Sequence, residues 1–276
     1  MSVVPQATVL TGHTDAVSAV DSISLSGRVH VLSGSHDCTV RVWDIGGQGR
    51  TRVLTGHTEQ VTSLSSCTVD GRVLILSGAF DKTVRIWDAE AGHELHVLDE
   101  HTEAVMSVAS CKIGVCVLVL SGSFDMTIRI WDAASGRPLK VLVGHTKWVR
   151  AVASCTCVSG HVLVLSGSFD KTVRIWGAET GEARKVLIGH TDAVTSVASC
   201  TAMMGRTLVL SGSFDGTMRV WDAETGSQLK CLLGHSRWIK AVCSPRHTAL
   251  GHACPPRHTA LGHSRRVKAV CPIPGI

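Results

Sequence analysis

The chain has 276 residues, carries a formal net charge of +5, and only 4% of its residues are aromatic. The N-terminus MSVVPQATVL lacks the charged and long apolar regions of a secretory signal, and no run approaches the roughly 18 apolar residues of a membrane-spanning helix, so no membrane association is expected. Seven of the 27 Lys and Arg residues lie in 232–276, which contains no acid, so the remaining 20 basic residues nearly balance the 22 acidic ones.

A block of 16 residues recurs five times along the chain and sets its organisation. The copies are VHVLSGSHDCTVRVWD (29–44), VLILSGAFDKTVRIWD (73–88), VLVLSGSFDMTIRIWD (117–132), VLVLSGSFDKTVRIWG (162–177) and TLVLSGSFDGTMRVWD (207–222). Their tryptophans are 44 or 45 residues apart, and a histidine near the start of each unit keeps the same spacing. A period of this length indicates a repeat architecture.

Each unit is predicted to contain four short strands separated by turns. In the third unit we expect strands over 104–111, 117–120, 127–131 and 138–143, with turns near Gly114, Ser123 to Asp125, and Ala134 to Gly136. Residues 7–10 match the segment that precedes each later histidine, so a lone outer strand is expected there. Strand and turn at this density predict an all-β radial array rather than βαβ units.

After the fifth unit the pattern fails. GHSRWIKAVC (234–243) fits the first strand of a sixth unit, but no second strand, Asp-containing turn or Trp follows it. PRHTALGH occurs at 245–252 and again at 256–263, and five of the seven prolines lie in this region. We predict that 244–276 is a basic, Pro/His-rich and poorly ordered tail.

A Gly-His near the start of each unit and a Trp-Asp near its end resemble the WD-repeat β-propeller family over residues 7 to about 243. The resemblance implies an all-β propeller with five complete four-stranded blades and an incomplete sixth. The predicted domain is 1–243, with repeats at about 13–44, 57–88, 101–132, 145–177 and 190–222 and a partial repeat at 235–243.

Four polar residues of each unit are assigned to one buried hydrogen-bond network. An indole N–H can only donate, so it needs a hydroxyl, which can donate onward to an imidazole whose other N–H meets a carboxylate. The family resemblance implies the same structural tetrad. The five tetrads are His13, Ser33, Asp37, Trp43; His57, Ser77, Asp81, Trp87; His101, Ser121, Asp125, Trp131; His145, Ser166, Asp170, Trp176; and His190, Ser211, Asp215, Trp221.

Serine, histidine and aspartate are also the residues of hydrolase triads, which would indicate catalysis. The set recurs five times and no GxSxG nucleophile elbow is present, which favours a structural role and a non-enzymatic protein. Two units depart from the pattern. Gly177 replaces the Asp after Trp176 and removes a turn-capping carboxylate, and Glu100 replaces the Gly before His101, which predicts a displaced loop at 99–102.

The loop that carries each tetrad His and the turn that carries each Asp must meet, so both are expected at one end of the propeller. In the resembled family, residues flanking them ring the mouth of the central channel and contact peptides. Aromatic and Arg side chains are also enriched at binding hot spots. The repeated Phe residues could instead simply pack on neighbouring turns. The predicted partner-binding residues are Phe80, Phe124, Phe169, Phe214, Trp148, Arg150, Trp238, Lys240, His36, Gln60 and Met106.

The sequence therefore predicts a scaffold that binds a peptide or protein partner. The alternative is a sensing or substrate-recognition subunit of a larger complex, such as a ubiquitin ligase receptor or an NTPase-linked sensor. No cofactor or small-molecule substrate is expected, because no Walker A pattern, HExxH motif or CxxC pair is present. No metal is expected either, because the duplication of PRHTALGH explains the spacing of His247, His252, Cys254, His258, His263 and Cys271. Nucleic acid is not an expected partner either.

The cysteines bear on location. Cys67, Cys111, Cys155 and Cys200 share one repeat position and would lie too far apart to bridge. They predict small buried thiols in a reducing compartment, the cytoplasm with the nucleus as the alternative.

The sequence leaves open how the ring of blades closes. Five blades close among themselves, the ring is gapped, or the tail or another chain fills the space. An unclosed sheet edge would favour self-association.

Overall fold

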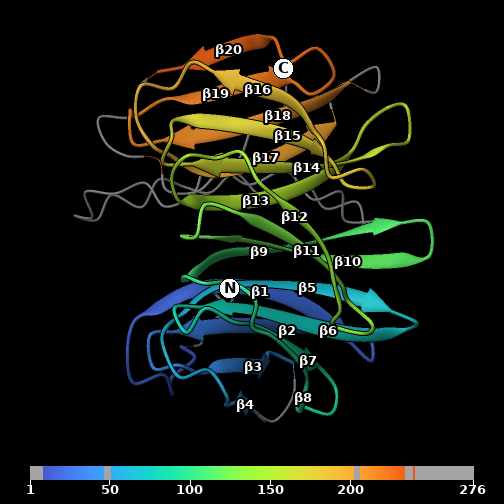
Figure 1. The fold of residues 1–276 in the computed structure, drawn as a ribbon. Helices are drawn as coiled ribbons and strands as arrows, with labels where there is room; N and C mark the ends of the chain where they lie inside the picture. Colours follow the sequence, from blue (N-terminus) through green and yellow to red (C-terminus); the bar gives the residue numbers. More distant parts are fainter. Residues whose placement is uncertain (1–8, 47–50, 202–205, 234–238, 240–276) are drawn as a thin grey trace, which may run out of the picture.

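A computed structural model describes residues 9–46, 51–201, 206–233 and 239. These residues form twenty β-strands and no helix, arranged in five separate four-stranded antiparallel sheets (Figure 1). In every sheet the strands are hydrogen-bonded in chain order. The prediction of an all-β propeller with five four-stranded blades is thus confirmed.

The strands of each blade run from the inner to the outer edge. The first blade contains β1 (Val17–Leu25), β2 (Arg28–Ser35), β3 (Val40–Asp44) and β4 (Thr51–Leu54); the second, β5 (Val61–Val69), β6 (Arg72–Ala79), β7 (Val84–Asp88) and β8 (Glu94–Leu98); the third, β9 (Val105–Ile113), β10 (Cys116–Ser123), β11 (Ile128–Asp132) and β12 (Pro138–Leu142). The fourth contains β13 (Val149–Thr156), β14 (Val162–Ser168), β15 (Thr172–Gly177) and β16 (Ala183–Ile188); the fifth, β17 (Val194–Thr201), β18 (Thr207–Ser213), β19 (Met218–Asp222) and β20 (Gln228–Leu232).

The blades follow one another in space as they do in sequence. In Figure 1 the first blade lies at the bottom and the fifth at the top. The lone outer strand predicted over 7–10 is not observed in its described half, because Val9 and Leu10 are outside any strand. The predicted tail 244–276 and most of the partial sixth repeat lie outside the described residues.

The hairpin between the first two strands is formed by residues that tolerate a left-handed backbone. In the first blade Ser26 and Gly27 have φ of 49° and 75°, and in the second Asp70 and Gly71 have φ of 48° and 80°. Two successive positive φ angles define the tight turn whose twist suits a two-stranded antiparallel hairpin. This turn positions the long inner strands that line the centre of the array.

The core lies between blades rather than within one. Each of the four consecutive blade pairs shares a cluster of buried apolar residues, such as the one that joins Leu120, Ile130 and Leu142 of the third blade to Val149 and Trp176 of the fourth. A single sheet cannot bury both of its faces, so stacking of neighbours supplies the hydrophobic stabilisation.

A glycine after each tetrad serine sets the distance between blades. A Cβ atom on Gly122 would lie 2.8 Å from Cγ1 of both Val149 and Val152, the two valines of the next inner strand. Gly34, Gly78 and Gly167 meet the next blade in the same way. The repeated Ser-Gly pair is therefore needed for close packing as well as for the polar network.

We expect Gly122→Ala to lower the free energy of unfolding by about 1–3 kcal/mol, because the added methyl overpacks the interface between the third and fourth blades. Gly46→Ala is the matched control, since nothing lies within 4 Å of its Cβ position; a change within about 0.5 kcal/mol is expected there. Urea unfolding followed by tryptophan fluorescence measures both. Equal losses in the two variants would contradict the packing role.

Candidate functional site

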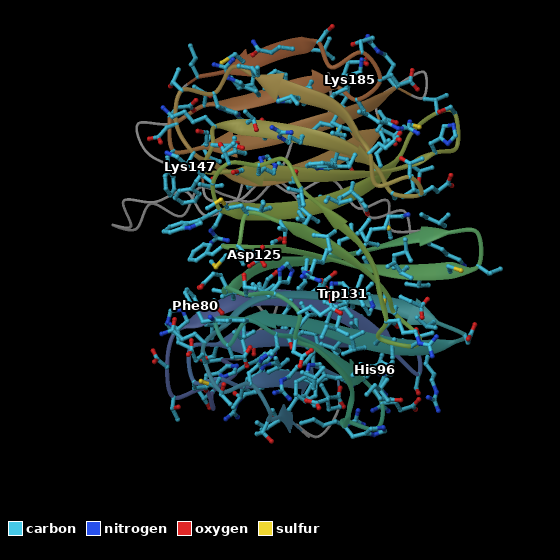
Figure 2. All side chains as sticks on the ribbon, in the orientation of Figure 1. Phe80, His96, Asp125, Trp131, Lys147 and Lys185 are labelled. Atoms are coloured by element: carbon cyan, nitrogen blue, oxygen red, sulfur yellow. The ribbon has the colours of Figure 1, made fainter. Side chains whose placement is uncertain are left out.

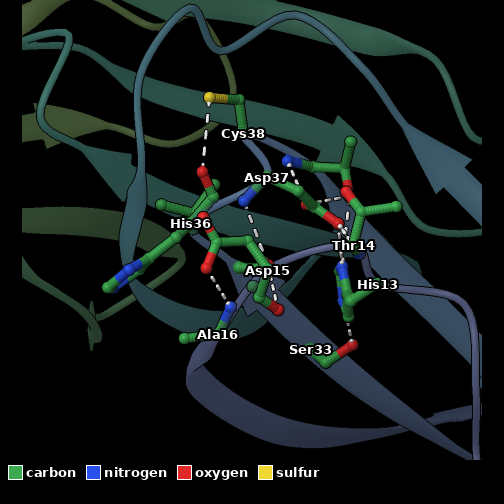
Figure 3. Close-up of polar contacts among 12 residues, drawn as sticks. His13, Thr14, Asp15, Ala16, Ser33, His36, Asp37 and Cys38 are labelled. Atoms are coloured by element: carbon green, nitrogen blue, oxygen red, sulfur yellow. Dashed lines mark hydrogen bonds and ion pairs between the residues drawn. The ribbon is translucent and has the colours of Figure 1, made fainter.

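The tetrads form the same hydrogen-bond chain in all five blades. The Trp indole N–H donates to Ser Oγ at 2.7–2.9 Å. The same Oγ lies 2.7–2.8 Å from His Nε2, and His Nδ1 lies 2.6–2.9 Å from Asp Oδ2. Figure 3 shows the first blade, where His13 lies between Ser33 and Asp37. Each of the four side chains of a tetrad has a hydrogen-bond partner, which is the condition under which a buried network stabilises a fold.

Solvent does not reach the serine hydroxyls of these networks. Ser77, Ser121, Ser166 and Ser211 are fully buried and Ser33 is 5% exposed. Each Oγ accepts from indole and faces imidazole, so a substrate carbonyl has no approach to it. The geometry gives the tetrad a structural role: it ties strand three to strand two, to the Asp turn and to the loop before the inner strand.

The tetrad carboxylates collect several hydrogen bonds. Oδ2 of Asp37 also accepts from the backbone N–H of Thr14 at 3.0 Å, and Oδ1 accepts from Thr39 Oγ1 at 2.6 Å. Burial acts to raise the pKa of Asp125, but hydrogen bonds from His101 and Thr127 outweigh it and lower that pKa to about 2. The pKa values of the other four tetrad aspartates are lowered by the same kinds of contact.

Glu100 is accommodated without moving its loop. In the other blades a glycine precedes the tetrad His, and a Cβ on Gly144 would lie 2.7 Å from Nη1 of Arg174. Glu100 instead forms an ion pair with Arg129. His101 keeps both tetrad contacts, at 2.6 and 2.7 Å, so the predicted displacement of residues 99–102 is not observed.

Gly177 leaves the fourth blade without a carboxylate cap at the turn between its last two strands. At the equivalent turn of the second blade, Asp88 Oδ1 accepts from the backbone N–H of Ala91 at 2.7 Å. The fourth blade retains the backbone bonds of this turn, from Gly181 N–H to Gly177 O at 2.8 Å and from Gly177 N–H to Glu182 O at 3.0 Å, so its turn keeps its path.

The His loop and the Asp turn meet at one end of each blade. The residue before each tetrad Asp donates its backbone N–H to the carbonyl of the residue three after the His, for example Phe124 to Ala104 at 2.9 Å and Phe169 to Trp148 at 3.0 Å. Figure 2 places Phe80, Asp125 and Lys147 toward the same side of the molecule. We call this end the mouth face.

The residue after each tetrad Asp is left-handed in every blade, with φ between 66° and 79° at Cys38, Lys82, Met126, Lys171 and Gly216. Only one of the five is glycine. A non-glycine residue in this conformation costs roughly 1–2 kcal/mol, so the hydrogen bonds around the Asp must hold the turn in place.

An unbroken row of aromatic side chains crosses the mouth face. Ring centroids are 6.1 Å apart between Phe80 and Phe124, 4.2 Å between Phe124 and Trp148, 5.4 Å between Trp148 and Phe169, and 5.8 Å between Phe169 and Phe214. Trp148 is stacked on Phe124 and is 44% exposed. The four Phe side chains are half-buried. We call these five residues the aromatic row.

The other predicted partner-binding residues are placed differently. Gln60 is exposed and His36 is half-buried at the mouth face. Met106 is 7% exposed and lies below the surface, and Arg150 Nη1 donates to the Met106 carbonyl at 3.3 Å. Burial lowers the pKa of Arg150. Trp238 and Lys240 lie outside the described residues.

Other chemistry is sparse in the part of the chain that the structure describes. It contains no cluster of three or more metal-ligating side chains and no helix with the length and apolar character of a membrane span. Cys67, Cys111, Cys155 and Cys200 are free thiols, and burial raises the pKa of Cys67 and Cys111 to about 11. Such thiols are poor nucleophiles.

The family model described as WD domain, G-beta repeat matches the chain five times, at residues 4–44, 48–88, 92–132, 136–177 and 181–222. Each match ends at the last residue of a third strand and includes one tetrad, and each match after the first also includes the outer strand of the preceding blade. A search of curated proteins finds no match to this chain.

We expect Ser121→Ala to lower the free energy of unfolding by about 1–3 kcal/mol, because it leaves the buried Trp131 indole and His101 imidazole without their shared partner. Ser227→Ala, at an exposed turn serine, should change it by less than about 0.5 kcal/mol. Denaturant unfolding measures both. A Ser121→Ala protein as stable as the parent would contradict the relay.

Acid should destabilise the fold in two stages. Burial outweighs the attraction of Asp215 and lowers the pKa of His190 below 6.5, so the unfolded state binds more protons as pH falls below that value. The tetrad aspartates have folded pKa values below 3.8, so their contribution is present above about pH 4 and is lost as pH falls toward 2. Urea unfolding from pH 7 to 2 measures the loss. Asp125→Asn should lose less of its free energy of unfolding below pH 4 than the parent does. An unchanged dependence of this free energy on pH would contradict the assignment.

Proposed function

Because the chain belongs to the WD40 family of G-beta repeats, we propose that it is a non-enzymatic scaffold that binds a peptide or protein partner at its mouth face. WD40 repeats generally mediate protein–protein interaction and scaffolding. The observation that supports a site on this particular face is the aromatic row, and above all the exposed indole of Trp148 stacked on Phe124 at 4.2 Å.

Trp148 has the properties of a binding anchor. Among the five complete units, only the fourth has a large aromatic residue at this position; the others have Ala16, Gln60, Ala104 and Ala193. Its backbone carbonyl accepts from Phe169 N–H, which fixes the loop to the Asp turn. A rigid, partly exposed aromatic loses little conformational entropy on binding and offers a large contact area.

The partner is proposed to present an apolar or aromatic side chain to the aromatic row. A phosphorylated peptide would need several arginines for bidentate contacts. The one arginine predicted for this face, Arg150, is half-buried and already bonded to the Met106 carbonyl. Lys147 precedes Trp148 and Lys171 follows the Phe169 turn; both are exposed and would favour acidic residues next to the anchoring side chain.

The alternative function, a sensing or substrate-recognition subunit of a larger complex, would use the same face and differ in what the scaffold is attached to. We also propose a reducing compartment, cytoplasm or nucleus, from the free thiols.

Trp148→Ala combined with Phe124→Asp is expected to remove partners that the parent protein captures from a cell extract. The expected loss is tenfold or more in captured amount, since truncation of an anchor costs roughly 2 kcal/mol or more. Leu139→Ala is the matched control, because Leu139 is 51% exposed but lies on outer strand β12. Quantitative mass spectrometry of the captured proteins provides the readout, with thermal denaturation as a check of folding. An unchanged partner set in the double variant would overturn the proposed site.

A further inference from the structure

Among the described residues, no blade precedes the inner strand of the first blade, whereas every other inner strand packs on the one before it. In blades two to five this strand starts with a valine, Val61, Val105, Val149 or Val194, whose side chain is 0% exposed and packs on the preceding blade's glycine. The equivalent residue of the first blade is Val17, which is 50% exposed. Val20, the equivalent of Val108 and Val152, is 71% exposed, against 5% and 6% for those two.

The same sheet face carries two further exposed apolar side chains. Val29 is 58% exposed, whereas Val117 and Val162 at its position are buried. Ile45 is 57% exposed, although alanines at its position in the next four blades are buried. We call Val17, Val20, Val29 and Ile45 the first-blade face. Several exposed apolar side chains on one sheet face are typical of an interaction site.

The opposite end of the array is already covered by a residue from beyond the fifth blade. Ile239 is 0% exposed and packs with Leu210, Met218 and Val220. Its N–H donates to Ser213 O at 3.2 Å, and its carbonyl accepts from Thr195 Oγ1. Thr62 Oγ1 bonds to the carbonyl of Val105 in the same way. Ile239 thus occupies the place where the inner strand of a next blade begins.

We propose that residues 240–276 lie against the first-blade face and cover it. The chain leaves Ile239 at the position where the inner strand of a sixth blade would start. In the second repeat, 27 residues separate Val61 from Asp88, the end of the third strand. The 37 residues that follow Ile239 are enough to span an equivalent sheet face.

Composition and charge support this occupant. Residues 240–276 contain the apolar segments Ala241 to Cys243 and Val267 to Cys271, and six Lys or Arg with no acid. The rest of the chain has 21 basic and 22 acidic residues and is close to neutral, so no net charge repulsion opposes contact with this basic segment. A segment tethered at Ile239 also has an effective local concentration far above that of a second copy in dilute solution. A second copy is therefore the competing occupant.

Disulfide trapping tests the proposal in the full chain. Val20→Cys is made with Cys116→Ser and Cys231→Ser, which remove two exposed thiols. Mild oxidation of the monomer is expected to link residue 20 to Cys254 or Cys271, as identified by mass spectrometry of the digest. Val186→Cys in the same background is the matched control, since Val186 is 43% exposed on outer strand β16, and no link to these cysteines is expected from it.

A charge substitution gives a second readout that does not depend on thiol geometry. Val20→Asp should lower the Tm of the monomeric full chain more than Val186→Asp does, because it places a carboxylate under a covered face. A link or this Tm difference in a monomer supports the proposal. Links only between residues 20 of two chains, in a concentration-dependent dimer, would assign the face to a second copy and overturn it. Absence of both link and Tm difference would also overturn it.

Discussion

Each blade depends on one buried donor that has no alternative: the indole N–H of its tryptophan. An unpaired indole N–H in the interior would destabilise the fold. When it donates to Ser Oγ, the hydroxyl in turn needs the histidine as its partner, and the histidine needs the aspartate. The consequence is local rigidity at the place where two loops meet. The aromatic row is held at fixed spacing because its backbone belongs to the loops that the tetrads join.

Stacking of the blades depends on a second, steric constraint. The glycine after the tetrad serine admits two apolar side chains of the next inner strand in four blades, as Gly122 admits Val149 and Val152. Polar and steric requirements therefore fall on adjacent residues of one strand. This proximity explains why the Ser-Gly pair recurs in all five units, and why a change there is felt both within a blade and between blades.

Much of this could be predicted from sequence because the repeat supplies five readings of each position. Trp, Ser, His and Asp recur with a donor and acceptor inventory that has one natural order, so the network could be written down before any coordinates. The contacts of residues that differ from the repeat in a single unit are harder to predict. Glu100 pairs with Arg129 across 29 residues, and Met106 is buried although polar side chains such as Thr62 and Arg150 stand at its position in other units. Ile239 was predicted within a partial strand, but its burial against the fifth blade depends on a long-range contact that no local pattern reveals.

The left-handed residue after each tetrad aspartate has a consequence for how such a surface can diversify. Cysteine, lysine, methionine, lysine and glycine stand at this site in the five units, yet the backbone angle varies by little more than ten degrees. The turn therefore fixes the position of this side chain in every blade, while the type of side chain can differ from blade to blade. A face assembled in this way can change its ligand preference one unit at a time without any rearrangement of the main chain.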